Sequence, residues 1–165
     1  MGDEQSGSWE AFLDSYIAFR NASLDLNQRW RSFMSDRDGA AARLKTALRG
    51  AGVNRGAALY ALSNMTADEL SQYFSELVYL ASYEHGSIQT PREMIRSLPR
   101  KWVLANIEHE AEPLLARGEY DTWRRLLELY YQLDPALTRR LASRAAAHTD
   151  SDVREAGEDF LEKLD

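Results

Sequence analysis

Acidic residues surround one histidine in the run Glu108-His109-Glu110, with Glu112 close behind. Carboxylates and imidazole at such close spacing are the groups that hold a divalent metal ion or share acid–base work. Successive residues of a helix, however, point about 100° apart, so these side chains cannot converge on one ion. The chain also lacks the Glu-x-x-His and His-Glu-x-x-His spacings of known helical metal sites. We therefore predict a solvated acidic turn here, with no metal, cofactor or catalytic residue.

The glycine-rich stretch 49–56 could bind phosphate, because glycines let backbone amides approach an anion. This stretch lacks the Gly-Lys-Ser/Thr ending of a P-loop and follows no predicted strand. His85 and His148 each fall near a predicted helix C-terminus, where the helix dipole favours imidazolium. The sequence thus predicts a turn at 49–56 and a protein that is not an enzyme, with an enzyme or cofactor carrier as a third alternative.

Arginine dominates the basic residues, since the 20 Lys and Arg include only three lysines. A guanidinium recognises carboxylates and phosphates through two parallel hydrogen bonds. Arg140 and Arg144 are candidates for binding another protein. A second basic strip is the candidate phosphate-binding surface of a nucleic-acid-associated protein: Arg92, Arg96, Arg100 and Lys101. The net charge of −6 makes nucleic acid the weaker alternative.

Two tyrosines, Tyr79 and Tyr83, lie four residues apart on the face of a predicted helix that otherwise carries polar residues. Either a second layer of helices covers them, or they are anchors in a protein interface, where tyrosine is favoured. They are therefore added to Arg140 and Arg144 as candidate protein-binding residues.

Composition places the chain among globular proteins, because 44% of its 165 residues are hydrophobic and 10% are aromatic. The absence of cysteine excludes disulfides, thiolate metal sites and cysteine nucleophiles. The polar N-terminus is followed by no apolar segment of the kind found in secretory signals or membrane anchors. We predict a disordered segment at 1–7, one helical domain over 8–165 and a cytoplasmic location without a membrane partner.

A long amphipathic helix is predicted over residues 9–35. Its apolar residues follow alternating four- and three-residue steps, which is typical of a helix that pairs with another along a seam: Phe12, Tyr16, Phe19, Leu26, Trp30 and Phe33, interrupted by Ser23. We favour one continuous helix over a break at 21–25. Trp9, Leu13 and Ile17 lie beside the seam, so it can be covered inside the monomer or in a homo-oligomer.

Local signals divide the middle of the chain into shorter helices. A capping box at Thr66–Glu69 predicts a helix that extends to about residue 85, and a second box at Thr90–Glu93 predicts a short one. Pro99 ends that helix and starts the next, and Pro113 kinks or ends it in turn. Short helices are also expected before Gly50 and after Asn54.

The C-terminal stretch 119–165 predicts three amphipathic helices with very short connections, which makes them antiparallel neighbours. Asp134-Pro135 marks the start of the second helix, and Gly157 lies in the apolar face of the last one, where it indicates a close approach by a neighbour. The sequence from Asp150 through Val153-Arg154 to Phe160-Leu161 resembles the helix signature of HEAT-type repeats. That resemblance implies a HEAT-like packing of helical hairpins over about 99–165.

Together these patterns predict an all-α fold of seven to nine helices in antiparallel hairpins, either an α-solenoid-like stack or an irregular bundle. The function that we predict is a non-enzymatic protein-binding module, such as an adaptor, an inhibitor or an immunity-type protein. Complementary charge would give such a module its register and its association rate. Nucleic-acid binding is the alternative, and self-association is compatible with both.

Overall fold

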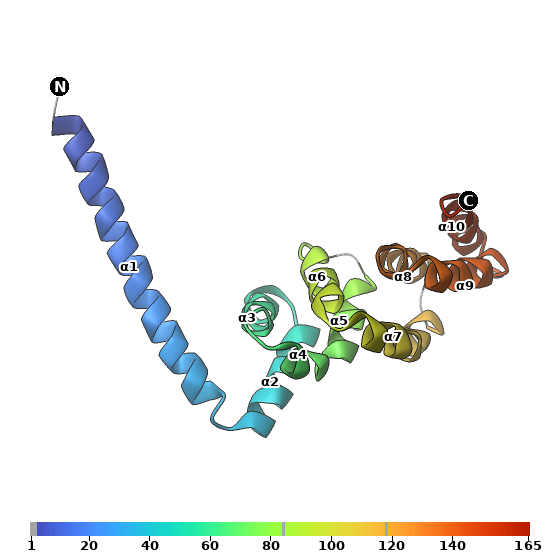
Figure 1. Cartoon of the computed structure of the whole chain (residues 1–165), viewed down its shortest axis with the longest axis horizontal. Coiled ribbons are helices and arrows are strands. Elements are labelled where there is room, and N and C mark those ends of the chain that lie inside the picture. The colour runs from blue at the N-terminus through green and yellow to red at the C-terminus, as the bar shows by residue number, and fades with distance from the viewer. Residues whose placement is uncertain (1–2, 84, 118) are drawn as a thin grey trace. The chain divides into compact units, whose positions relative to one another are not determined.

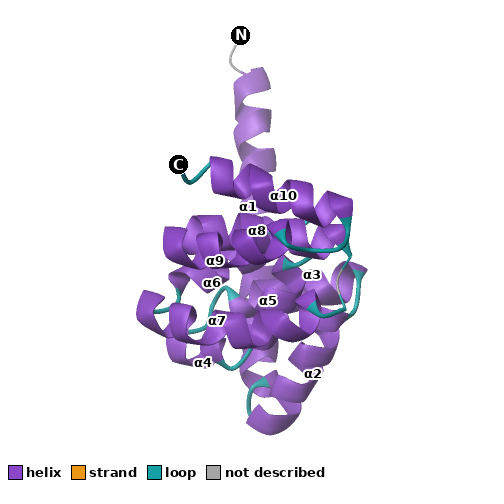
Figure 2. Cartoon of the chain, turned by 90° about the vertical axis from the view of Figure 1, so that its right-hand side faces the viewer, coloured by secondary structure: helices purple, strands orange, loops and turns teal. Residues whose placement is uncertain are grey.

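A computed structural model describes residues 3–83, 85–117 and 119–165, and every regular element in these ranges is a helix (Figure 1, Figure 2). The prediction of an all-α fold is therefore confirmed. The described ranges contain ten helices, one more than the upper limit expected from the sequence: α1 Asp3–Phe33, α2 Arg37–Arg49, α3 Gly52–Leu62, α4 Ala67–Ser71, α5 Phe74–Ala81, α6 Gln89–Ser97, α7 Arg100–Leu115, α8 Tyr120–Leu133, α9 Pro135–Ala146 and α10 Ser151–Glu162.

The additional helix arises because the single helix predicted from Thr66 to about residue 85 is two helices, α4 and α5. At the junction, the amides of Gln72 and Tyr73 donate to the carbonyls of Glu69 and Leu70, three residues back instead of four. Such tight bonds shorten the turn. Tyr73 leaves the helical conformation, at φ −108° and ψ 13°, and α5 starts afresh at the next residue.

Helix starts follow the sequence signals at several positions. However, α3 begins at Gly52 and not after Asn54, so the turn predicted at 49–56 is confined to residues 50 and 51. Thr66 and Glu69 form the predicted capping box, and Asp134 and Asp150 accept hydrogen bonds from the first amides of α9 and α10. The box predicted at Thr90 is not formed, because α6 begins at Gln89 and Thr90 lies inside its first turn. Pro113 does not end α7, which continues to Leu115.

The chain divides into two compact units, Met1–Leu44 and Lys45–Asp165, with the boundary inside α2. The N-terminal unit is dominated by α1, which continues through 21–25 without a break. Residues 1 and 2 of the predicted disordered segment 1–7 lie outside the described residues, and the backbone of 3–7 belongs to α1. We call the second unit the helical body.

Two helices organise the helical body: α5 packs against α6, α7 and α8, and α8 in turn packs against α7, α9 and α10 (Figure 1). Their apolar stripes are fully enclosed, as the exposure of Leu77, Leu80, Leu126 and Leu127 falls to zero. The apolar residues of α9 that face the core are buried as well: Leu137, Leu141, Ala142 and Ala145. Long-range packing therefore joins helices far apart in the sequence around a continuous core.

The last two helices make the most extensive contact in the body. Gly157 permits it, because a Cβ atom built there would lie 2.7 Å from the Ala142 carbonyl oxygen and 2.8 Å from the Ala145 carbonyl carbon. The close approach predicted from the sequence is thus confirmed. Within the described residues, no helix combines enough length with enough apolar character to cross a membrane.

Candidate protein-interaction surfaces

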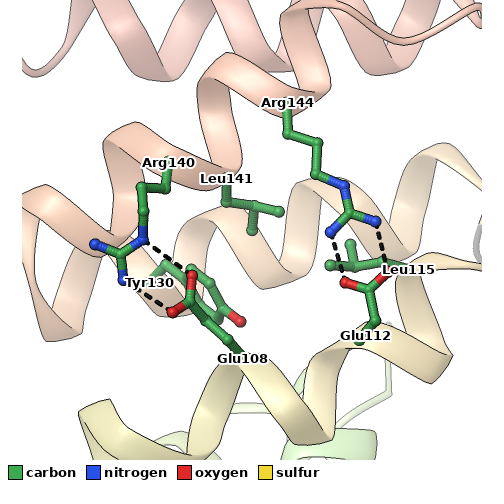
Figure 3. Close-up of a pocket in the computed structure, with 7 residues that line it drawn as sticks. All are labelled: Glu108, Glu112, Leu115, Tyr130, Arg140, Leu141 and Arg144. Atoms are coloured by element: carbon green, nitrogen blue, oxygen red, sulfur yellow. Dashed lines mark hydrogen bonds and ion pairs between the residues drawn. The ribbon is translucent and has the colours of Figure 1, made fainter.

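Two parallel ion pairs link α7 to α9 on the surface of the helical body (Figure 3). The Arg140 guanidinium donates to both carboxylate oxygens of Glu108, at 3.1 and 2.9 Å. The Arg144 guanidinium does the same to Glu112, at 2.5 and 2.7 Å. Both helices carry the paired residues four positions apart, which is one helical turn, so the two pairs stand side by side.

The two ion pairs flank a groove of about 140 Å³ with Tyr130 at its base. The Tyr130 ring is buried, and its hydroxyl is 3.5 Å from the Ile107 carbonyl oxygen, to which it donates. Burial raises the pKa of Tyr130 far above its usual value, so the hydroxyl stays protonated and neutral. The groove therefore offers an apolar floor between two neutralised charge pairs, which suits a small apolar or amide-bearing side chain.

The charges in these pairs stabilise one another. Hydrogen bonds from Arg144 lower the pKa of the Glu112 carboxyl below its usual value. Hydrogen bonds to Glu108 and Glu112 likewise raise the pKa of Arg140 and Arg144. The side chains are about half exposed, so the net contribution of each pair to stability is about 0–1 kcal/mol. A charged partner can therefore exchange with them at small cost.

The structure thus places the predicted protein-binding residues Arg140 and Arg144 together on one exposed face, but with internal partners. Arg144 is further held by cation–π contact, because its guanidinium lies 5.4 Å from the centre of the Trp123 ring. The acidic residues around His109 were predicted to form a solvated turn. Instead, Glu108 and Glu112 point from α7 toward the arginines of α9.

The rings of the other predicted pair, Tyr79 of α5 and Tyr83 just beyond its end, contact each other at a tilt, with centres 5.1 Å apart. Both rings are partly buried, and arginines of the body lie over them: Arg49 over Tyr79 at 5.3 Å and Arg55 over Tyr83 at 5.6 Å. Burial raises the pKa of Tyr83. Each tyrosine ring therefore has an arginine side chain over it, Arg49 of α2 or Arg55 of α3.

Arg92 does not lie on the surface as the predicted phosphate-binding strip requires, since it is only 3% exposed. Its guanidinium donates to Glu128 at 2.9 Å and to the Arg125 carbonyl oxygen at 3.1 Å. Glu128 also accepts from Arg125, at 2.9 and 3.1 Å. Burial acts to raise the pKa of Glu128, but the hydrogen bonds from Arg92 and Arg125 outweigh it, so the pKa lies below its usual value. Arg92 is a structural residue that ties α6 to α8.

The three remaining residues of that strip are exposed. Arg100 donates to the Asp134 carboxylate at 2.7 Å and to the Leu133 carbonyl oxygen at 3.3 Å. Arg96 and Arg100 line a second groove, of about 190 Å³, between α6, α7 and α8. With Arg92 buried and Arg100 paired, the strip offers a phosphate at most Arg96 and Lys101 without a competing ion pair within the described residues.

The three histidines lie apart from one another in roles that their positions explain. A ring nitrogen of His85 is 2.8 Å from the Leu80 carbonyl oxygen near the end of α5. His148 stacks on Trp123 at 5.1 Å after α9, and His109 is exposed on α7. No group of three or more His, Asp or Glu side chains in the described part of the chain is placed to hold a metal ion.

Among the described residues, eight of the twelve exposed large apolar side chains lie on α1. Large side chains there, among them Trp9, Phe12, Tyr16 and Phe19, are 36–68% exposed. Their rings stack along the helix, with Trp9 and Phe12 centres 5.4 Å apart and Phe12 and Tyr16 centres 6.5 Å apart. We call the following residues the α1 stripe: Trp9, Phe12, Tyr16, Phe19, Ser23, Leu26, Trp30 and Phe33. Within its own unit, the first half of this stripe faces water.

Sequence reasoning identified the α1 stripe from Phe12 to Phe33 and placed Trp9 beside it, but it missed the pairing of α7 with α9 and the buried Arg92–Glu128 contact. A signal for the first was present, because Glu108 and Glu112 have the same four-residue spacing as Arg140 and Arg144. Comparison of the chain with protein-family models, curated proteins and solved structures found no match. The resemblance to HEAT-type repeats stays a prediction, and function is argued from the surfaces alone.

Proposed function

We propose that the chain is a non-enzymatic protein-binding module, acting as an adaptor, an inhibitor or an immunity-type protein. The observation that carries this proposal is the α1 stripe, whose first four aromatic rings, from Trp9 to Phe19, are 50–68% exposed. A contiguous apolar surface rimmed by polar residues marks a site where another protein binds. Tyrosine, tryptophan and phenylalanine are the residues that contribute most to such interfaces.

The helical body supports the proposal as a rigid carrier with a second, polar contact surface. The face formed by Glu108, Glu112, Arg140 and Arg144 presents alternating charge beside an apolar groove. Charges in this arrangement select a partner by complementarity and steer its approach. Partner carboxylates would take the place of Glu108 and Glu112 on the arginines.

The proposal extends to the architecture and the location of the protein. The packing of α8, α9 and α10 on one another supports a stack of helical hairpins like that of HEAT-type repeats, which are themselves binding scaffolds. A cytoplasmic location remains a prediction from the sequence.

The test is a pull-down from the source cell's lysate, with and without nuclease, read by mass spectrometry. Phe12→Gln/Phe19→Gln is expected to lose a stoichiometric protein partner that the wild type retains after nuclease treatment. Each buried aromatic side chain contributes about 1.5–3 kcal/mol, so the loss should be complete. Ile17→Gln/Leu24→Gln is the matched control, because these residues are 52% and 59% exposed but lie outside the stripe.

A charge-reversed variant tests the second surface without breaking its ion pairs. Glu108→Arg/Glu112→Arg/Arg140→Glu/Arg144→Glu keeps both pairs but inverts the polarity that a partner meets. Unchanged helicity with reduced partner binding would assign this face to the interface. Retention of every captured protein by both the Phe12/Phe19 and the charge-reversed variants would contradict the proposal, and captured material that disappears with nuclease would favour the nucleic-acid alternative.

A further inference from the structure

We infer that the α1 stripe binds the same stripe of a second copy of this chain, with the two helices antiparallel. This inference rests on the proposed function, because it assigns a partner to the surface that carries it. Four observations support it: the spacing of residues in the stripe, the internal hydrogen bond of Ser23, the charge along α1 and the apolar area that a dimer could bury.

The spacing of the α1 stripe is that of a helix which pairs along its whole length. Its residues alternate steps of three and four from Trp9 to Phe33, which places them at the a and d positions of successive heptads. Trp9, Tyr16, Ser23 and Trp30 are the a residues, and Phe12, Phe19, Leu26 and Phe33 are the d residues. The repeat covers nearly four heptads, enough for a stable two-helix contact.

Ser23 interrupts the stripe but does not prevent its burial. Its hydroxyl donates to the Phe19 carbonyl oxygen at 2.9 Å, one turn back in the same helix. A buried polar group is costly only when it lacks a hydrogen bond, so this one can enter an interface without a partner across it. As the smallest residue of the stripe, Ser23 also leaves space for a large ring on the facing helix.

The charge along α1 selects the direction of pairing. Residues 8–19 carry Glu10 and Asp14 and no basic residue, whereas 20–33 carry three arginines and one aspartate, Asp25. Asp25 is already paired with Arg29 at 2.8 Å. Two parallel helices would place acid beside acid along the first half. Antiparallel helices bring the acidic half of each copy beside the basic half of the other. Glu10 and Asp14 occupy heptad positions b and f, outside the seam, so this attraction is weak and acts at long range.

Antiparallel pairing also fits the sizes of the side chains. With a residues facing d residues and the twofold axis near Asn21, Trp9 lies opposite Phe33 of the second copy and Phe12 opposite Trp30. Tyr16 then faces Leu26, and the small Ser23 faces Phe19. The arrangement thus sets each aromatic ring against a ring, a leucine or the space above the serine. Arg20 is an exception to the favourable pairing of charge, because it lies near the twofold axis beside Arg20 of the second copy.

The area is sufficient for a dimer. An aromatic side chain has roughly 200 Å² of surface, and those of the first half of the stripe are at least half exposed. These four rings expose on the order of 900 Å² in two copies together, and Leu26, Trp30 and Phe33 add to this. Two stripes can therefore bury on the order of 1,200 Å², at the lower end of the range of specific protein interfaces. An isolated helix is marginal in water, and packing of this kind stabilises it.

The oligomeric state of the purified full chain is the first measurement. Sedimentation or light scattering should give a dimer, and Phe12→Gln/Phe19→Gln should weaken it by at least about a hundredfold. Ile17→Gln/Leu24→Gln, at heptad position b and so outside the α1 stripe, should leave the dimer intact, and circular dichroism should show that both variants stay helical. A monomeric wild type, or a dimer that is weakened only by the Ile17/Leu24 pair, would overturn the inference.

Orientation is measured with single labels, because the chain has no cysteine of its own. Ala11→Cys and Ser32→Cys lie off the stripe near opposite ends of α1. In an antiparallel dimer, probes on one Ala11→Cys and one Ser32→Cys copy should be about 10 Å apart, and those on two identical copies about 30 Å. The reverse pattern, measured by energy transfer or by dipolar spectroscopy, would show a parallel dimer and overturn the inference.

The two proposals fail separately. If the wild type is a monomer and Phe12→Gln/Phe19→Gln still loses a different protein in the pull-down, the proposed function stands and the inference of a homodimer is wrong. If the wild type is a dimer and the Phe12→Gln/Phe19→Gln variant loses no other protein in the pull-down, α1 serves self-association alone.

Discussion

At the scale of single residues, the buried contact between Arg92 and Glu128 shows how one carboxylate serves several cations. Glu128 accepts hydrogen bonds from Arg92 and Arg125, and Arg124 lies 4.0 Å away. The Arg92 side chain is 4% exposed, whereas that of Glu128 retains 25%. Removal of the negative charge would leave a guanidinium in the core with only neutral oxygens to accept from it, among them the Arg125 carbonyl oxygen.

We therefore expect Glu128→Gln to lower the free energy of unfolding by about 3 kcal/mol, because an uncompensated buried charge costs about 3–5 kcal/mol and Glu128 is partly solvated. Urea denaturation at neutral pH measures this. Arg100→Met is the matched control. It removes an exposed pair with Asp134 that also joins residues 34 positions apart, and it should cost less than about 1 kcal/mol. Equal losses in the two variants would contradict the assignment.

Glu128 also makes stability depend on pH in a defined direction. Its pKa is lower in the folded chain than in the unfolded chain, where a glutamate titrates near about 4.3. The stabilisation is thus fully present above about pH 4.3 and is lost as the pH falls through the lowered folded value. Glu128→Gln should therefore show a smaller loss of stability on acidification than the wild type. An identical slope in both proteins would count against a role for this carboxyl.

At the scale of helices, the contact between α9 and α10 depends on the absence of one side chain. A Cβ at Gly157 would meet the α9 backbone, which cannot give way as the end of a flexible side chain can. Overpacking of this kind typically costs about 1–3 kcal/mol. Since this is the most extensive helix contact in the body, its loss should lower the stability of the whole unit.

Gly157→Ala should therefore lower the midpoint of thermal unfolding, even though alanine favours helix by about 1 kcal/mol over glycine. Gly56→Ala provides the control, because it also lies inside a helix, α3, and has no atom within 4 Å of its Cβ position. That substitution should raise the midpoint or leave it unchanged. A stabilised Gly157→Ala variant would show that α9 and α10 can separate freely.

At the scale of the whole molecule, charge bears on the choice between protein and nucleic acid as a partner. The chain carries a net charge of −6. Of the four cations predicted to bind phosphate, Arg92 is buried and Arg100 is paired. Useful affinity for DNA requires several cations on one face, each of which releases counterions from the phosphates.

We expect the protein to bind a short DNA duplex or single strand with a Kd weaker than about 100 μM at about 150 mM salt. Fluorescence anisotropy over a series of salt concentrations measures this. Micromolar affinity that falls steeply as salt rises, and that is lost in Arg96→Glu/Lys101→Glu, would instead establish the nucleic-acid alternative.

The sequence by itself determined most of the helices of this protein, because these depend on neighbours within a turn or two of helix. The steps of three and four from Phe12 to Phe33 predicted α1. Side-chain caps at Thr66, Asp134 and Asp150 placed three helix starts. The position of Gly157 in an apolar helix face predicted a close contact with a neighbouring helix, which is α9.

Only the tertiary structure decided which elements meet, and hence which charges are available. Arg140 and Arg144 form ion pairs with Glu108 and Glu112, 32 residues away, and Arg92 is buried with a hydrogen bond to Glu128. The junction between α4 and α5 likewise appears only in the folded chain. Each of these depends on the order in which helices pack, a long-range property that periodicity does not record, because the same stripe can face any apolar neighbour.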